Sequence, residues 1–239
     1  MKYYNINKSE LSQFKKVYQS TIKFDKFLEQ KLQNSEKILD IGSGIGGTLS
    51  YYVKKYPKIN FILSDYRTKN ISVAKLLYKK KYTNINFIKF DIYKKKNFKK
   101  LQNPCGIISE KNFCTYKNIE RPIQNLLKLN PKWIAINSLF YEGNMDTLIH
   151  VRDRIKNKVQ SKDNNPDGDF NIFSLSNLRS ILKKTNYRIV KAIPFYPSKK
   201  IIKKNNSQGT YTLKTEFNKN SCFTGPVFLP WFFILIEKK

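Results

Sequence analysis

The sequence is poor in residues that bind metals or form cross-links. Its 239 residues include one histidine and three cysteines, and the cysteines are scattered without a C-x-x-C pair. We therefore expect neither a disulfide framework nor a metal site. No run approaches the ~20 apolar residues that span a bilayer, and residues 1–5 lack the apolar run of a signal peptide. These absences predict a cytoplasmic protein.

Acidic residues are also scarce, because 17 Asp and Glu face 46 Lys and Arg and give a formal net charge of +29. Such a charge attracts anionic partners, including nucleic acids. Only six of the 46 basic residues are arginine, however, and phosphate and base recognition favour the planar guanidinium. Lysine with abundant Asn, Ile and Tyr is also what an A/T-rich genome encodes. A nucleic-acid partner is therefore possible but not favoured.

The order of apolar segments predicts an α/β fold, since strands alternate with helices as in right-handed β-α-β units. We expect a Rossmann-like, mostly parallel seven-stranded sheet with helices on both faces. An N-terminal helical extension (1–34) precedes the α/β domain (35–239), with a β-hairpin inserted at about 196–226. Strands are predicted at 37–41, 59–65, 85–90, 105–109, 132–138, 187–193 and 227–236. Helices are predicted at 9–32, 144–159 and 174–184, among others, and a turn-rich loop at 161–169.

The segment Asp40-Ile41-Gly42-Ser43-Gly44-Ile45-Gly46-Gly47 follows the first predicted strand. Glycines there allow a sharp turn and a close approach to a ligand at a helix N-terminus. A Walker A loop is excluded, because Thr48 stands where its lysine must be. The spacing G-x-G-x-x-G also satisfies the dinucleotide fingerprint. A carboxylate at Asp40 would repel a pyrophosphate, however, and would attract a ligand that carries an ammonium group.

This glycine motif resembles the nucleotide-binding motif of the class I S-adenosylmethionine-dependent methyltransferases, and the resemblance covers about residues 35–195 in order of elements. It implies S-adenosylmethionine as cofactor and S-adenosylhomocysteine as product. It also implies that an acid ending the second strand contacts the ribose and one following the third strand contacts the adenine. The cofactor-binding residues implied are Asp40, Gly42, Gly44, Gly46, Asp65, Tyr66, Asp91 and Ile92.

By the same resemblance, the loop after the fourth strand faces the methyl donor. It reads Ser109-Glu110-Lys111-Asn112-Phe113 and lacks the (Asn/Asp/Ser)-Pro-Pro-(Tyr/Phe) motif of many base and amide methylases. Glu110, together with Tyr141 and Glu142 after the fifth strand, could orient or deprotonate an acceptor. His150 falls on the predicted 144–159 helix, where a surface or partly buried position is the more probable reading.

The C-terminal third is similar to segments of bacterial methyltransferases that accompany surface-glycan and other small-metabolite pathways. This similarity implies a polar small-molecule or sugar-linked acceptor, with Asn171, Tyr211 and Trp231 as substrate-binding residues. Tyr211 and Trp231 offer flat faces to a sugar or a cation, although Trp231 could equally be a core residue. Two alternatives stay open, namely an RNA methyltransferase and a non-catalytic protein that kept the cofactor pocket. The oligomeric state is unknown.

Overall fold

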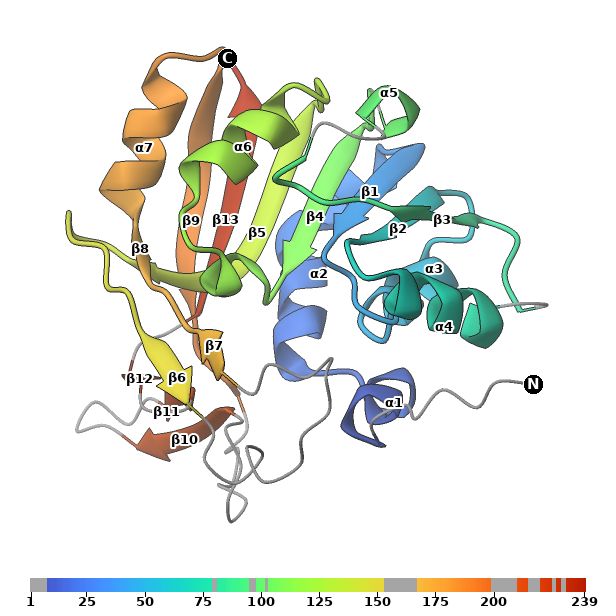
Figure 1. The fold of residues 1–239 in the computed structure, drawn as a ribbon, viewed down its shortest axis with the longest axis horizontal. Helices are drawn as coiled ribbons and strands as arrows, with labels where there is room; N and C mark the ends of the chain where they lie inside the picture. Colours follow the sequence, from blue (N-terminus) through green and yellow to red (C-terminus); the bar gives the residue numbers. More distant parts are fainter. Residues whose placement is uncertain are drawn as a thin grey trace.

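A mostly parallel β-sheet forms the centre of the protein, which we describe from a computed structural model (Figure 1). The strands of its main path are β1 (Lys37–Ile41), β2 (Asn60–Asp65), β3 (Ile85–Lys89), β4 (Gly106–Glu110), β5 (Trp133–Tyr141), β9 (Tyr187–Phe195) and β13 (Trp231–Lys238). Their order is β3-β2-β1-β4-β5-β13-β9, and a short eighth strand, β8 (Phe173–Ser174), pairs with β5 beside that path. The structure describes residues 8–78, 81–94, 98–101, 103–152, 167–198, 210–214, 220–224, 227–228 and 231–239.

The strand directions confirm the predicted Rossmann-like fold. All neighbouring pairs from β3 to β5 are parallel, whereas β13 runs antiparallel to both β5 and β9. Because the parallel strands share one direction, their carboxyl ends meet at one edge of the sheet. That edge is where the polar residues singled out in the sequence come together.

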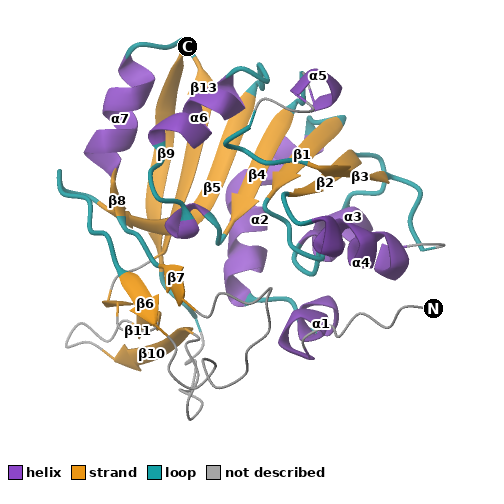
Figure 2. Ribbon diagram, in the orientation of Figure 1, coloured by secondary structure: helices purple, strands orange, loops and turns teal. Residues whose placement is uncertain are grey.

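Helices cover both faces of this sheet (Figure 2). On one face, α2, α3 and α4 bury residues such as Phe24 and Val53 in one apolar cluster. On the other, α5, α6 and α7 bury residues such as Leu126 and Leu178 in a second cluster. The helices are α1 (Lys8–Lys15), α2 (Gln19–Gln33), α3 (Leu49–Lys55), α4 (Thr68–Tyr78), α5 (Phe98–Leu101), α6 (Glu120–Leu127) and α7 (Leu175–Lys183), with a 3₁₀ turn at Phe113–Thr115.

The N-terminal helices are confirmed as α1 and α2, and α2 is tied to α3 by a buried acid. Asp25 of α2 is 1% exposed and accepts hydrogen bonds from the hydroxyls of Tyr51 (3.0 Å) and Tyr56 (2.6 Å). Lys55 adds an ion pair to the same carboxylate. These bonds fix α2 beside the helix that begins just after the glycine turn. The division of the chain at residue 34 stays a prediction.

The segment after β5 differs from its prediction. Instead of a helix from 144 to 159, His150 opens strand β6 (His150–Arg152), which pairs with β7 (Asp167–Asp169) inside a stretch predicted as a loop. The reason is long-range pairing, because Thr147 and Ile172 exchange backbone hydrogen bonds of 2.8 and 2.9 Å that a helix would have used locally. The helix prediction is therefore wrong where the segment is described. Residues 153–166 lie outside the described residues.

The predicted C-terminal strand is divided, and the predicted hairpin is confirmed. Strand β12 (Val227–Phe228) is separate from β13, and residues 229–230 between them lie outside the described part. Strands β10 (Thr210–Lys214) and β11 (Asn220–Thr224) pair antiparallel, and β12 joins them in a small sheet. Figure 1 shows this sheet at the same end of the molecule as β6 and β7. That the hairpin covers the active face stays a prediction.

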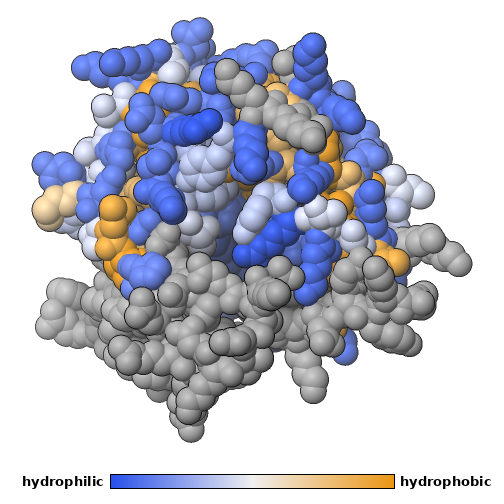
Figure 3. Space-filling model, viewed as in Figure 1, coloured by the Kyte–Doolittle hydropathy of each residue, from blue (hydrophilic) through white to orange (hydrophobic). Residues whose placement is uncertain are grey.

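The visible surface of the described part is mostly hydrophilic (Figure 3). Apolar residues form separate small patches on this face rather than one continuous area. No helix in the described ranges is both long and apolar enough to cross a membrane.

Candidate active site

The turn after β1 has a backbone that glycine permits. Gly42, Gly44 and Gly46 have φ values of 69°, 58° and 88°, in the left-handed region that other residues rarely adopt. At Gly46 a side chain is also excluded by contact, because a Cβ would lie 2.6 Å from Cδ1 of Leu63 and 2.8 Å from the ring of Tyr78. The predicted glycine turn is therefore confirmed as a tight bend at the end of β1.

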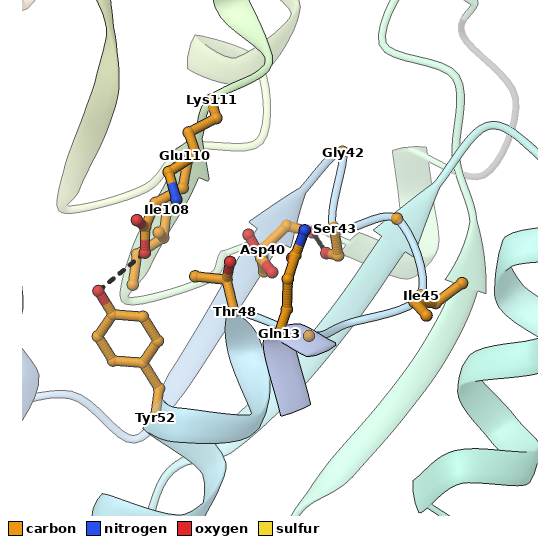
Figure 4. A pocket seen from close by; sticks show the side chains of 12 residues that line it. Gln13, Asp40, Gly42, Ser43, Ile45, Thr48, Tyr52, Ile108, Glu110 and Lys111 are labelled. Atoms are coloured by element: carbon orange, nitrogen blue, oxygen red, sulfur yellow. Dashed lines mark hydrogen bonds between the residues drawn. The ribbon is translucent and has the colours of Figure 1, made fainter. Parts of the chain in front are cut away.

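The glycine turn lies where the order of the sheet reverses. Strands β2 and β3 lie on one side of β1, and strands β4 and β5 lie on the other. In open parallel sheets, ligands bind outside the carboxyl ends of the strands at this reversal. A cavity of about 200 Å³ opens there (Figure 4), and its lining residues are Gln13, Asp40, Gly42, Ser43, Gly44, Ile45, Gly47, Thr48, Tyr52, Ile108, Glu110 and Lys111.

Asp40 is the acid in the wall of this cavity next to the glycine turn. It is 6% exposed, and burial is the main cause that raises its pKa to about 8. The charges of Glu110 and Asp65 raise the pKa further, and a hydrogen bond from Ser43 opposes the rise. Burial thus disfavours the ionised carboxylate, and a cation bound beside it would stabilise it.

Two further acids follow Asp40 along the same edge of the sheet. Asp65 ends β2 and is 5% exposed, and its carboxylate accepts hydrogen bonds from the backbone N–H groups of Gly44 (3.0 Å) and Arg67 (2.8 Å). The first of these bonds ties the end of β2 to the glycine turn. Asp91 follows β3 and accepts from the N–H of Tyr93 at 3.0 Å. The three acids therefore stand at the ends of three adjacent strands, as the sequence predicted.

Glu110 ends β4 on the other side of the cavity. Its Oε1 accepts a hydrogen bond from the hydroxyl of Tyr52 (2.9 Å), and its Oε2 accepts from Thr21 (3.3 Å) and from the side-chain amide of Asn137 (3.2 Å). Burial raises the pKa of Glu110. Three donors from three different elements hold this carboxylate in place, facing the same cavity as Asp40 (Figure 4).

Comparisons with known proteins agree with this geometry. The profile of the methyltransferase small domain family matches residues 18–108, which include α2, the glycine turn and the ends of β1 and β2. Together, the match and the fold support a class I S-adenosylmethionine-dependent methyltransferase. No curated protein sequence matches the chain.

Solved structures share this methyltransferase fold at low sequence identity. The N-terminal domain of EvdMO1, crystallised with S-adenosylhomocysteine, is 11% identical with a TM-score of 0.56, covering 92% of this chain and 80% of that one. A second structure of that domain was obtained in the presence of D-fucose. The 1,6-didemethyltoxoflavin-N1-methyltransferase of Burkholderia thailandensis is 11% identical (TM-score 0.60, 97% and 86% covered). Magnesium protoporphyrin IX methyltransferase of Synechocystis PCC 6803 is 10% identical (TM-score 0.56, 98% and 93% covered).

Five of the eight residues predicted to bind the methyl donor lie outside the cavity lining, namely Gly46, Asp65, Tyr66, Asp91 and Ile92. Tyr66, after β2, is 53% exposed, and its hydroxyl accepts a hydrogen bond from Nε of Arg67 at 2.6 Å. Ile92, after β3, is 6% exposed, and its carbonyl accepts from the side chain of Asn125 at 2.7 Å. Both lie next to an acid at the carboxyl edge, and their contacts with the donor stay predictions.

The acceptor-side candidates are placed at the end of β5. This strand runs three residues past its predicted end at Ser138, so Tyr141 is its last residue and is 37% exposed. Glu142 follows it and is exposed. Gly143 packs against the Tyr141 ring, since a Cβ on Gly143 would lie 2.3 Å from Cε1 of the ring. Neither Tyr141 nor Glu142 lines the cavity, and both side chains are exposed to solvent.

The three predicted substrate-binding residues have different surroundings. Asn171 is 3% exposed, and its side chain joins two loops by donating to the carbonyl of Tyr116 (2.7 Å) and accepting from the N–H of Ile149 (3.0 Å). Trp231 is 8% exposed within the core cluster, which favours the core alternative left open by the sequence. Tyr211 lies in β10. A direct role in substrate binding therefore has little support for Asn171 and Trp231.

The structure adds residues that sequence analysis missed. Gln13 of α1 packs on the glycine turn, because a Cβ on Gly47 would lie 2.5 Å from Cβ of Gln13. Thr48 and Tyr52 line the cavity from the start of α3 and from one turn later. The helix after the glycine motif could have indicated Thr48 and Tyr52 by their spacing of four residues. Nothing in the sequence points to Gln13.

Proposed function

We propose that this chain transfers a methyl group from S-adenosylmethionine to an oxygen or nitrogen of a polar small molecule, such as a sugar or a sugar conjugate. The observation that carries the proposal is the buried Asp40 beside the bare backbone of the glycine turn. S-adenosylmethionine brings an ammonium group, which would stabilise the ionised carboxylate. A pyrophosphate at the same turn would raise the electrostatic energy instead.

The other acids at the sheet edge suit the remaining polar groups of this donor. Asp65, held by the N–H groups of Gly44 and Arg67, is the proposed partner of the ribose hydroxyls. Asp91, at the end of the next strand, is the proposed partner of the adenine amino group. Carboxylates accept hydrogen bonds from hydroxyl and amino groups alike, so the residues present fit the donor.

When bound, S-adenosylmethionine supplies a methyl group on a positively charged sulfur. The chain must then hold the acceptor in line with that methyl group and exclude water, which can contribute up to ~7–11 kcal/mol. Tyr141 ends β5, the strand next to β4, and Glu142 follows it, so we propose that both orient the acceptor. A hydroxyl acceptor also needs a base, for which Glu142 is the proposed residue, whereas an unprotonated amine does not.

The proposal of a small polar acceptor rests on three supports. The solved structures named above include two enzymes whose names state small-molecule acceptors and a domain studied with D-fucose. The loop after β4 lacks the proline motif of many base and amide methylases. Only six of the 46 basic residues are arginine, so the positive charge gives little support to nucleic-acid recognition.

The test is an acceptor panel with methyl-labelled S-adenosylmethionine. Sugars, nucleotide sugars, hydroxylated aromatics, small amines and total RNA would each be incubated with the full chain, and label transfer measured. We expect transfer to at least one small molecule and none to RNA, with loss in Asp40→Asn. Glu142→Gln should lose turnover on a hydroxyl acceptor while binding S-adenosylhomocysteine as before. Transfer to RNA alone would show that the acceptor class is wrong, and donor binding without any transfer would indicate a binding protein.

A further inference from the structure

The cavity beside Asp40 is too small for the whole methyl donor. At about 200 Å³ it falls below the ~300–1,000 Å³ usual for small-molecule sites. Its walls come from the glycine turn, the start of α3 and the end of β4, whereas Asp65 and Asp91 stand further along the edge. If the nucleoside lies beside those two acids, this cavity is left for the amino-acid end of the donor.

Lys111 places a cation in this cavity. It directly follows Glu110 and has φ +64°, which is uncommon for a residue with a side chain. Its N–H donates to the carbonyl of Asn137 at 2.7 Å, which fixes the turn at the end of β4. Figure 4 shows the Lys111 side chain running back past Glu110 rather than away from the cavity. Lys111 therefore lines the same cavity as Asp40 and Glu110.

The Lys111 ammonium lies over an aromatic ring. Its Nζ lies 4.0 Å from the centre of the Tyr18 ring. Among the residues that the structure describes, no ion pair within 4.0 Å involves Lys111. Burial lowers its pKa, while the charge of Glu110 partly offsets that effect. A half-buried cation beside a ring would be stabilised further by an anion that enters the cavity.

The charges around the cavity thus match an amino-acid zwitterion. Two carboxylates, those of Asp40 and Glu110, and one ammonium group, that of Lys111, belong to residues that line the cavity. We propose that Lys111 binds the carboxylate of the methyl donor and that Glu110, with Asp40, binds its ammonium. This inference rests on the proposed function, and it makes Glu110 a donor-binding residue rather than a base for the acceptor. The hydrogen bonds from Tyr52, Thr21 and Asn137 hold Glu110 in that position.

The test combines variants of the full chain with three ligands that differ at one end. S-adenosylhomocysteine carries both groups, its decarboxylated analogue keeps only the ammonium, and 5′-methylthioadenosine lacks both. Dissociation constants come from isothermal titration. In Lys111→Met we expect S-adenosylhomocysteine to bind about 10- to 100-fold more weakly, since a charge-assisted hydrogen bond is lost. The decarboxylated analogue and 5′-methylthioadenosine should bind as to the wild type.

Glu110→Gln has the complementary expectation. Both ligands that carry the ammonium should bind more weakly by a similar factor, and the affinity for 5′-methylthioadenosine should not change. Lys111→Arg should recover part of the affinity for S-adenosylhomocysteine, because it keeps the charge. Lys183→Met, on the exposed side of α7, is the matched control and should change nothing. Unchanged binding of 5′-methylthioadenosine also shows that each variant is folded.

Two results would overturn the inference. Lys111→Met could weaken the binding of S-adenosylhomocysteine and of its decarboxylated analogue equally, which would mean that Lys111 does not recognise the carboxylate. It could also leave both affinities unchanged and raise only the KM of the acceptor, which would place Lys111 on the acceptor side. If the wild-type chain binds none of the three ligands, the proposed function itself fails, and that outcome is distinct from the other two.

Discussion

The glycine turn allows a quantitative prediction, because two of its glycines are conformationally alike but differ in their surroundings. Gly46 has φ +88°, and an added Cβ would meet Leu63 at 2.6 Å and the ring of Tyr78 at 2.8 Å. Gly44 has φ +58°, and nothing lies within 4 Å of its would-be Cβ. Alanine at either position adds backbone strain, but only at Gly46 does it also add a clash.

Backbone strain and the clash each lower the free energy of unfolding by a different amount. The left-handed conformation costs a non-glycine residue roughly 1–2 kcal/mol. Forcing extra volume into a packed site costs about 1–3 kcal/mol more, and Leu63 and Tyr78 are 0% and 2% exposed, so they have little room to move. We therefore expect Gly46→Ala to lower the free energy of unfolding by about 2–5 kcal/mol and Gly44→Ala by about 1–2 kcal/mol.

Urea denaturation followed by circular dichroism measures both values on the ligand-free chain. Gly44→Ala serves as the matched control, since it carries the backbone cost without the clash. Equal destabilisation by the two substitutions, or a neutral Gly46→Ala, would refute the packing described for this turn.

Three further predictions concern side chains. Asp25→Ala should lower the free energy of unfolding, measured by chemical denaturation, by about 2–3 kcal/mol. Breaking a fully buried ion pair costs about 3–5 kcal/mol, and we expect less here because the Lys55 side chain is 39% exposed. Ser174→Ala should cost about 1 kcal/mol in the same assay, because its Oγ accepts the N–H of Asn177 at 3.1 Å at the start of α7. A loss below 0.3 kcal/mol would rule out that cap. The raised pKa of Asp40 means that its protonated form favours the fold, so its contribution is present below pH 4 and is lost as pH rises towards 8. Unfolding free energies from pH 4 to 8 should therefore fall more steeply for the wild type than for Asp40→Asn, and identical slopes would contradict the burial of that charge.

Local sequence patterns were enough to predict the sheet, the glycine turn and the position of the acids at the sheet edge. Alternating strands and helices specify the layers, and the glycine turn needs only backbone freedom at Gly42, Gly44 and Gly46. The acids Asp40 and Asp65 could be predicted because each ends a parallel strand, and parallel topology brings those ends together. These inferences depend on short-range signals together with one general rule of sheet geometry.

What the sequence could not predict depends on contacts between distant segments. The pairing of Thr147 with Ile172 replaced a predicted helix by a strand. The bond from Tyr52 to Glu110 joins residues 58 positions apart, so no local pattern indicates it. Trp231 resembled a ligand-stacking residue in sequence, and only its burial between β5 and β9 shows that it belongs to the core.

The central claim is that an acid buried beside the glycine turn receives the ammonium group of the methyl donor. The most direct measurement is isothermal titration of S-adenosylhomocysteine at pH 6.5 in two buffers with different heats of ionisation. Because burial raises the pKa of Asp40 to about 8, we predict that binding releases most of one proton and that Asp40→Asn binds more weakly without that release. Binding with no proton released, or equal affinity in the variant, would contradict the account.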